Sequence, residues 1–499
     1  MLAAAITAAA VMSVPAIGTG AEDPAVTYDL SEGSVTISTD GTYIITQSDS
    51  TATTNNITVE AGVNADITLS GVNIDVSGQD YVCAFKIADN STGNVTVILA
   101  ANTENTLKSG MYSASLQKNG GGEDIGTLTI TGEGILTATG GGYGAGIGSG
   151  DMGNSKNITI SGGTVTATGG DWASGIGGGD RGSGSNITIS GGVVTATGGN
   201  SGAGIGGGYG GNGSNITISG GTVTANGRNG GAGIGNGYGT YDGNNSGIVI
   251  NGGSVKANSI ANAQPTDGNE NNVYLLTLSN GNDETIVIDD KVYAPVNHKA
   301  ADPEDGNLYA YLTGEEHTVK TGDLFHIYVY DNGFTAYDMK IIFVNENDEV
   351  IDTVYANNGD DISALAPEIP EKEGYTGAWD TDLGAITESC TVKAVYTEIP
   401  DESSEESSDV SSEESSDITS DESSDVTSDS NTESGISDES AGSSDTESVS
   451  DSSSDSADSS KADSSASGSS DKNPSTGAAA GAAAVLLIGA GVAVLKKRG

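Results

Sequence analysis

Short runs that alternate apolar with small or polar residues recur between about residues 126 and 259. Three nearly identical copies of Asn-Ile-Thr-Ile-Ser-Gly-Gly begin at Asn157, Asn186 and Asn215, so the step between copies is constant. A second run, Gly-Ile preceded by Ala or Ser, keeps this step. Its isoleucines are Ile147, Ile176, Ile205 and Ile234. A fixed period of this size is typical of a solenoid, in which each repeat buries its apolar face against its neighbours.

The pattern within each repeat predicts strands. Three runs, Asn-Ile-Thr-Ile, Thr-Val-Thr-Ala-Thr and Ala-Gly-Ile-Gly, have the two-residue period of a strand. They are rich in Val, Ile and Thr, which favour a pleated strand, and glycine pairs separate them. Three strands and three corners per coil describe a right-handed parallel β-helix of about 29 residues per coil, in an all-β protein.

Stacked coils place equivalent residues in interior rows, and we expect one Ile or Val row per face, padded by Ala. The asparagines at one corner of the coil should stack and hydrogen-bond one another. The predicted rows are Ile158, Ile187 and Ile216; Val165, Val194 and Val223; and the four isoleucines of the Gly-Ile run.

The rest of the chain divides by composition. Short strands at similar spacing precede the regular repeats, so the β-helix is expected to extend over 22–262. This length corresponds to roughly eight coils. An antiparallel β unit is expected over 272–336, as a cap for the exposed strand edges at the end of the solenoid or as a spacer. A compact module follows over 337–399, and 400–472 is a Ser/Asp/Glu-rich stretch predicted to be a disordered stalk.

Both ends carry signals for export and attachment. Residues 1–21 are apolar, rich in alanine and end in small residues, as in a secretory signal peptide, although they lack its positive start. Residues 473–499 contain a short motif, an apolar run over 478–495 long enough to be a transmembrane helix, and a basic end. The motif is Asn473, Pro474, Ser475, Thr476 and Gly477.

Together these three C-terminal features resemble a Gram-positive sortase cell-wall sorting signal, with asparagine in place of the usual leading leucine. The resemblance implies cleavage after Thr476 and attachment of that residue to peptidoglycan, or anchoring by the membrane helix if cleavage does not occur. The 337–399 module, with Pro-x-x-Pro-x-Lys-x-Gly-Tyr from Pro367 and a final Val-x-Ala-Val-Tyr, resembles the β-grasp-like repeats in stalks of Gram-positive surface proteins. Trp379 in this module is interpreted as a core residue. The expected location is the outside of a Gram-positive cell surface.

Segments such as Asp66–Asp75 and Gly126–Gly132 resemble the secreted clostridial carbohydrate-binding β-helix proteins, which share the polysaccharide-lyase fold. That resemblance implies calcium-assisted binding of plant-wall polysaccharide, including acidic pectins. It assigns no binding residue to this chain.

Charge narrows the range of partners. The chain has 68 acidic and 18 basic residues, a formal charge of −50. Phosphates would be repelled, so nucleic acid is not an expected partner, whereas divalent cations would be attracted.

The candidate binding surface is the corner that flanks the Gly-Ile run. Aromatic residues beside carboxylates could stack on sugar faces and hold Ca²⁺. The alternative is that these are solvated loop residues whose rings stack for stability. The candidates for sugar contact are Tyr143, Trp172, Tyr209 and Tyr238, and those for metal binding are Asp151 and Asp180.

Three functions remain open from the sequence. The favoured one is a surface-anchored, adhesin-like protein that binds polysaccharide and is not an enzyme. A structural surface protein without a ligand is the alternative. A calcium-dependent lyase, with Asp151, Asp180 and Arg181 assembled as its site, is less favoured, because a repeat brings such residues together automatically.

Overall fold

The structure, a computed structural model, describes residues 24–123, 125–240, 247–261, 264–279, 284–294 and 307–400. These residues form strands and turns, and they contain no helix long and apolar enough to cross a membrane. The predicted signal peptide, acidic stalk, sorting motif and helix 478–495 lie outside the described residues, apart from Pro400.

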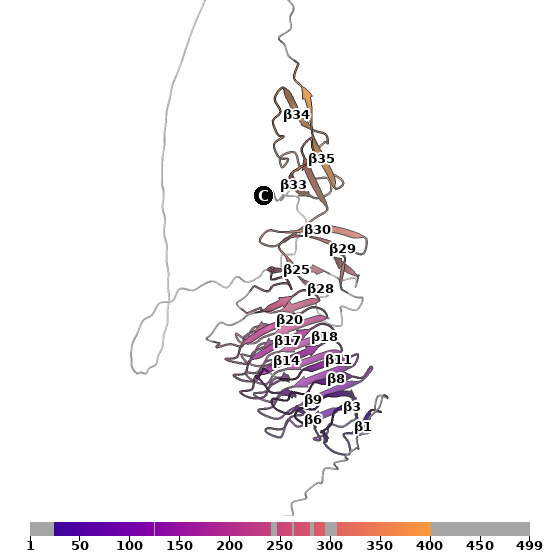
Figure 1. Cartoon of the computed structure of the whole chain (residues 1–499), viewed down its shortest axis with the longest axis vertical. Coiled ribbons are helices and arrows are strands. Elements are labelled where there is room, and N and C mark those ends of the chain that lie inside the picture. The colour runs from indigo at the N-terminus through magenta and orange to yellow at the C-terminus, as the bar shows by residue number, and fades with distance from the viewer. Residues whose placement is uncertain are drawn as a thin grey trace, which may run out of the picture. The chain divides into compact units, whose positions relative to one another are not determined.

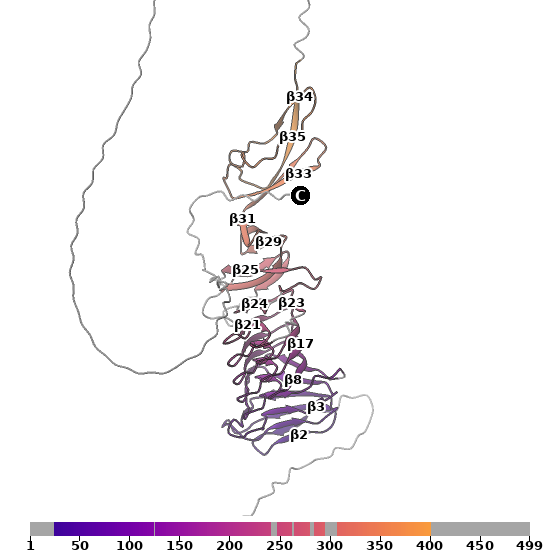
Figure 2. The same cartoon turned by 90° about the vertical axis from the view of Figure 1, so that its left-hand side faces the viewer.

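Residues up to Ala257 form a parallel β-solenoid of three sheets (Figures 1 and 2). Sheet A contains nine strands: β1 (Val26–Asp29), β3 (Gly41–Thr46), β5 (Ala65–Ser70), β8 (Val95–Leu99), β11 (Leu128–Gly132), β14 (Ser155–Ile160), β17 (Gly184–Ile189), β20 (Gly213–Ile218) and β23 (Ile248–Ile250). Sheet B contains eight: β2 (Val35–Ile37), β4 (Ile57–Val59), β7 (Phe85–Ile87), β10 (Leu116–Lys118), β13 (Ile147–Gly148), β16 (Ile176–Gly177), β19 (Ile205–Gly206) and β22 (Ile234–Gly235). Sheet C contains seven: β6 (Asn73–Asp75), β9 (Glu104–Lys108), β12 (Ile135–Thr139), β15 (Thr164–Thr168), β18 (Val193–Thr197), β21 (Thr222–Asn226) and β24 (Ser254–Ala257).

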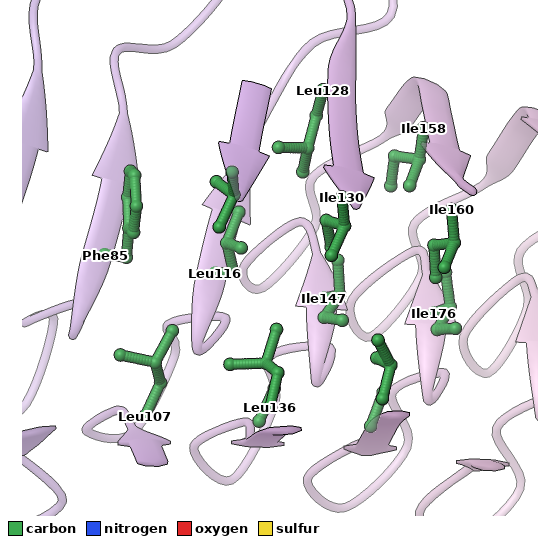
Figure 3. Close-up of a cluster of buried hydrophobic side chains, with 14 of the residues drawn as sticks. Phe85, Leu107, Leu116, Leu128, Ile130, Leu136, Ile147, Ile158, Ile160 and Ile176 are labelled. Atoms are coloured by element: carbon green, nitrogen blue, oxygen red, sulfur yellow. The ribbon is translucent and has the colours of Figure 1, made fainter. Parts of the chain in front are cut away.

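The registers confirm the predicted interior rows. Ile158 pairs with Ile187, Val165 with Val194, and Ile147 with Ile176, and all of these side chains are buried. Figure 3 shows such rows continuing through the earlier, less regular coils. The expectation of one row per face is wrong for sheet A, because both isoleucines of Asn-Ile-Thr-Ile point inward. Ile160, Ile189 and Ile218 therefore form a second fully buried row.

The solenoid has about seven complete turns, one fewer than the sequence predicts. The first two coils are incomplete, because they supply strands to sheets A and B but none to sheet C. They are also short, since Val26 pairs with Tyr43, and Tyr43 with Ile67. The regular repeats take a longer step, such as the one from Ile158 to Ile187. The first strand of sheet C is β6, which starts only at Asn73.

The predicted asparagine stack is present, but it lies at a bend inside the strands β14, β17 and β20 and not at a corner between strands. The Nδ2 of Asn186 donates to Oδ1 of Asn157 at 3.0 Å, and Nδ2 of Asn215 donates to Oδ1 of Asn186 at 3.2 Å. All three residues have positive φ, between 51° and 60°, which asparagine tolerates better than most residues. The stack therefore provides hydrogen-bond partners for the side chains and accommodates the bend in each strand.

Small β domains follow the solenoid. β25 (Val273–Ser279) pairs with β28 (Asn307–Thr313), and Tyr309 N donates to Ser254 Oγ in the last coil at 3.2 Å. A five-stranded antiparallel sheet has the order β27 (Lys291–Ala294), β26 (Ile286–Ile288), β29 (Glu316–Thr321), β30 (Leu324–Tyr330) and β31 (Phe334–Tyr337).

The last described module is a mixed four-stranded sheet. Its order is β33 (Val350–Ala356), β32 (Met339–Val344), β35 (Cys390–Glu398) and β34 (Tyr375–Trp379), and the central pair β32–β35 is parallel. The ring of Trp379 packs against Phe343, with centroids 4.9 Å apart. This contact supports a core role for Trp379.

Candidate functional site

The corner predicted to bind a ligand is built by two loops, one on each side of sheet B. Because strands such as Ile176–Gly177 are so short, the loop before the strand (169–175) and the loop after it (178–183) approach each other. Within one coil, Ser174 N donates to Gly178 O at 2.9 Å. Between coils, Asp180 N donates to Tyr143 O at 2.9 Å. We call these the entry loop and the exit loop, and the equivalent loops of the other coils take the same names.

Six aromatic rings from these loops form one continuous ladder. Successive ring centroids lie 4.6, 5.2, 5.7, 5.9 and 6.4 Å apart. The rings belong, in order, to Tyr81, Tyr112, Tyr143, Trp172, Tyr209 and Tyr238. The structure therefore brings the four predicted aromatic residues together and adds two that the sequence reasoning missed.

The ladder changes character at Trp172. The rings of Tyr81, Tyr112 and Tyr143 are nearly parallel, with interplanar angles of 11° and 18°. Their inner faces cover one another, as expected for rings stacked for stability. Trp172 stands at 61° to Tyr143, and the two following contacts are tilted at 41° and 38°. The rings from Trp172 onward therefore no longer stack face to face. This difference lies in the ring angles and not in exposure, since Trp172 is 37%, Tyr238 56% and Tyr81 73% exposed.

The ladder also crosses from one loop to the other. Its first four rings come from entry loops, and its last two come from exit loops. One period after Trp172 the entry loop has Ser201, and the next coil has Gly230, where an added Cβ would lie 2.5 Å from the Tyr238 ring. The small entry-loop residues thus leave the space that the exit-loop tyrosines occupy.

In the two coils whose entry loops supply Tyr143 and Trp172, the exit-loop position is a carboxylate. Asp151 and Asp180 precede Tyr209 and Tyr238 in this series, and Asp151 N donates to Tyr112 O at 2.9 Å. Burial raises the pKa of Tyr112, and the neighbouring tyrosines and Asp151 add to this effect. The aromatic and acidic residues therefore form one surface, as predicted from their spacing.

Asp180 is an unusual member of this surface because it is buried. Its side chain is 3% exposed, and its Oδ1 has no hydrogen-bond partner among the described residues. Burial raises its pKa, Asp151 raises it further, and Arg181 lowers it. A buried carboxylate oxygen without a partner is costly unless a proton, a water or a cation satisfies it.

The predicted metal ligands stop at these two carboxylates. Among the described residues no group of three His, Cys, Asp or Glu side chains is arranged to hold a metal ion. Oxygen ligands are what Ca²⁺ prefers, and backbone carbonyls could complete a set begun by Asp151 and Asp180. Arg181 lies beside them and is exposed, whereas Arg228 is on the entry loop, where its N donates to Gly202 O at 3.3 Å.

The missed rings could have been found by counting from the strands. Tyr143 and Trp172 each lie four residues before the isoleucine that begins a sheet B strand. Tyr112 lies four residues before Leu116, and Tyr81 four before Phe85. Both escaped a search at the period of the regular repeats, because the two coils between Phe85 and Ile147 take a longer step than the regular repeats. Phe85 pairs with Leu116, and Leu116 pairs with Ile147.

Comparison with known proteins supports the fold. A family model described as a beta helix repeat matches residues 128–151, 158–180, 187–209 and 216–238. No curated protein and no solved structure matches the chain. The matched stretches include all four predicted aromatic positions and both predicted carboxylates, and together with the three parallel sheets they support a β-helix repeat protein.

Proposed function

We propose that this chain is a surface-anchored, adhesin-like protein whose β-helix binds extracellular or plant-wall polysaccharide. One observation carries the proposal: the aromatic ladder opens at Trp172, Tyr209 and Tyr238 instead of continuing as a closed stack. Exposed aromatic rings on a polar surface are suited to the apolar faces of sugar rings, because such packing buries area on both sides. β-Helices also occur often in surface and polysaccharide-related proteins.

The rings divide into two roles. Tyr81, Tyr112 and Tyr143 stabilise the corner by stacking on one another, and this part resembles a purely structural ladder. Trp172 and Tyr238 provide the sugar platform, with Tyr209 fixed between them. A glycan would therefore contact the later coils of the ladder.

Calcium is the proposed cofactor. Asp151 and Asp180 would supply oxygen ligands. Oδ1 of Asp180 has no hydrogen-bond partner among the described residues, so it is available to bind a cation. A divalent ion beside the aromatic platform would attract the carboxylates of acidic sugars to a chain with a formal charge of −50. When bound, the ion would supply only this charge bridge. We propose binding, and not catalysis, for this arrangement.

The proposed location is the outside of a Gram-positive cell. The signal-like segment 1–21 would direct export, sortase would join Thr476 to peptidoglycan, and helix 478–495 would hold the chain in the membrane before or without that step. The acidic stretch 400–472 would separate the β-helix from the wall by charge repulsion. All of these segments except Pro400 lie outside the described residues.

The test is retention of the full-length protein on insoluble and acidic polysaccharides, with calcium and with chelator, while unsaturated and reducing ends are followed. Retention that chelator abolishes, without release of ends, is the expected result. Release of ends would show a lyase or hydrolase instead. Absence of both retention and release would leave the structural surface protein, which the closed Tyr81–Tyr112–Tyr143 stack favours.

A further inference from the structure

The outer face of sheet C carries a regular grid of threonines. Four neighbouring strands, β12, β15, β18 and β21, pair in register through five consecutive residues each, without a bulge. Alternate residues of each strand point outward, which gives three outward positions per strand. The grid consists of Ile135, Thr137, Thr139, Thr164, Thr166, Thr168, Val193, Thr195, Thr197, Thr222, Thr224 and Asn226.

The grid is uncharged and rigid. None of its twelve residues is ionisable, although the chain as a whole has a formal charge of −50. Eleven of the twelve are half-buried, and β-branched side chains have restricted rotamers, so the positions of their methyl and hydroxyl groups are well defined. Within the part of the chain that the structure describes, the threonine hydroxyls of the grid form no hydrogen bond to protein.

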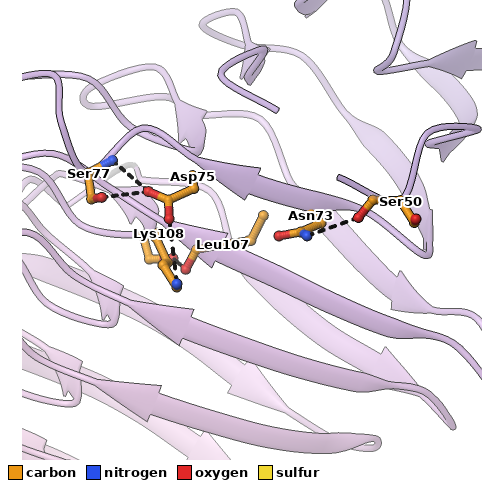
Figure 4. Close-up of polar contacts among 7 residues, drawn as sticks. Ser50, Asn73, Asp75, Ser77, Leu107 and Lys108 are labelled. Atoms are coloured by element: carbon orange, nitrogen blue, oxygen red, sulfur yellow. Dashed lines mark hydrogen bonds and ion pairs between the residues drawn. The ribbon is translucent and has the colours of Figure 1, made fainter. Parts of the chain in front are cut away.

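Charged residues mark the edge of the grid. On the neighbouring strands of the same sheet, Lys108 Nζ lies 3.5 Å from Oδ2 of Asp75. Figure 4 shows this pair together with Ser77, whose backbone N and hydroxyl both donate to Asp75. At the other side, Lys256 on β24 follows Thr224 in the register. The neutral area is therefore a defined patch of four strands.

A second copy of the chain does not fit this patch. Five residues span about 17 Å along a strand, and four strands span about 19 Å, so the patch covers roughly 300 Å². A stable protein–protein interface needs about 800 Å² from each partner. Because the grid has no charged residue, it cannot form ion pairs with a charged partner. We therefore expect its partner to be a neutral surface whose repeat matches the spacing of the grid.

The grid spacing agrees with that of an ordered water lattice. Its hydroxyls repeat at about 4.8 Å between strands and, because the strands are parallel, at about 6.6 Å along a strand. Water oxygens that hydrogen-bond at about 2.8 Å with tetrahedral angles repeat at about 4.5 Å in one direction and about 7.3 Å in the perpendicular one. The mismatch is about 7% between strands and about 10% along a strand, over only four strands. Sugar-binding sites, by contrast, use aromatic, amide or carboxylate groups at fixed points, and the grid has one amide and no aromatic group.

We propose that the threonine grid of sheet C binds the surface of ice. Its hydroxyls would take lattice positions, and its methyl groups would fill the spaces between lattice waters. This site is separate from the aromatic ladder and does not depend on the proposed polysaccharide function.

The test follows ice growth in a solution of the full-length protein, by crystal shape and by the gap between melting and freezing temperatures. Thr195→Lys places a charge in the grid, and Thr195→Leu breaks its spacing without charge. Thr36→Lys, on the exposed face of β2 in sheet B, is the matched control. Circular dichroism confirms that each variant is folded.

The expected result is shaped crystals and a temperature gap for the wild type and Thr36→Lys, with both lost in the two Thr195 variants. A wild type without effect on ice overturns the proposal. So does an effect that the Thr195 variants retain. Retention on crystalline polysaccharide that Thr195→Lys abolishes, without any effect on ice, would assign the grid to a solid glycan instead.

Discussion

Trp172 and Tyr209 are in contact although they belong to different loops of different coils. Their ring centroids are 5.9 Å apart, and Tyr209 N donates to Trp172 O at 2.7 Å. This contact joins the entry-loop part of the ladder to the exit-loop part. It also lies where the closed stack ends and the ring faces begin to open, so Trp172 is the residue whose removal best tests the ligand surface.

Trp172→Ser should weaken polysaccharide binding without unfolding the coil. Ser201 occupies the equivalent position of the next coil with the same φ of 67°, so serine is already accepted in this backbone conformation. Removal of the ring takes away its packing on sugar, worth about 1.4 kcal/mol, and retention should fall about tenfold. Affinity electrophoresis on acidic polysaccharide measures the change.

Tyr81→Asn is the control for that experiment. Tyr81 is the first ring of the ladder, is 73% exposed and has a φ of 63°, which asparagine tolerates. The variant should bind like the wild type, because Tyr81 belongs to the closed stack. If Tyr81→Asn and Trp172→Ser weakened binding equally, the assignment of separate roles to the two parts of the ladder would be wrong.

Gly177→Ala should destabilise the solenoid strongly. Gly177 has a φ of 130°, and an added Cβ would lie 2.1 Å from Gly206 O in the next coil. The coils would have to separate in sheet B, at a cost of about 4 kcal/mol or failure to fold. Gly210→Ala is the matched control, since Gly210 also has positive φ but has nothing within 4 Å, and it should cost about 1 kcal/mol. Urea unfolding of both variants separates close packing from backbone strain.

The regular coils were predictable because one interaction dominates them. Ile158 must lie over Ile187 for the interior to be filled, so the constant repeat step determines sheet, register and corner together. The asparagine stack followed from the same step. Where the coils lengthen, as between Leu116 and Ile147, the period no longer identifies equivalent residues, and Tyr112 was missed.

Other features depended on three-dimensional closeness that spacing does not reveal. The sequence placed Trp172 in one series and Tyr209 in another, and nothing in the period indicates that the two loops meet over so short a strand. The burial of Asp180 was likewise not predictable, because Asp151 has the equivalent position and is only half-buried. Equivalent positions in a repeat share a backbone but not an environment.

Asn186→Gly should lower stability through the asparagine stack alone. Glycine accepts the φ of 51° at this position, so the variant removes two side-chain hydrogen bonds without new strain. The expected loss is about 2 kcal/mol, since each bond contributes about 1 kcal/mol. Asn102→Gly, at an exposed position with a φ of 60°, is the control and should change stability much less. Equal losses in thermal unfolding would show that backbone entropy, and not the stack, is responsible.

Asp180→Asn should stabilise the protein at neutral pH in the presence of chelator. Burial raises the pKa of Asp180 in the folded state, so its contribution to stability is fully present below the unfolded pKa and is lost as pH rises through the folded pKa. The variant has no charge to bury, and its advantage should disappear in acid. Melting temperatures between pH 3 and pH 8 measure this, with the exposed Asp171→Asn as control.

Calcium gives the same variant a second readout. If Asp180 binds the ion, calcium should raise the melting temperature of the wild type and leave Asp180→Asn unchanged. An equal rise in both proteins would place the ion elsewhere. No rise in either would remove calcium from the proposed function.

Lys118→Met should stabilise the fold most at and below neutral pH. Lys118 is 3% exposed, its Nζ donates to Lys156 O at 2.8 Å, and burial lowers its pKa to about 8. Between that value and the unfolded pKa of about 10.4 the unfolded chain binds more protons, so wild-type stability rises with pH across this range. Below a pH of about 8, the buried charge lowers the stability of the wild type by about 3 kcal/mol, a cost that methionine avoids.

Urea unfolding from pH 7 to pH 10 should show the advantage of the Lys118→Met variant shrinking as pH rises. Lys86→Met, at a half-buried lysine of the neighbouring strand β7, is the control. A constant difference for Lys118→Met would mean that packing and not charge determines its effect.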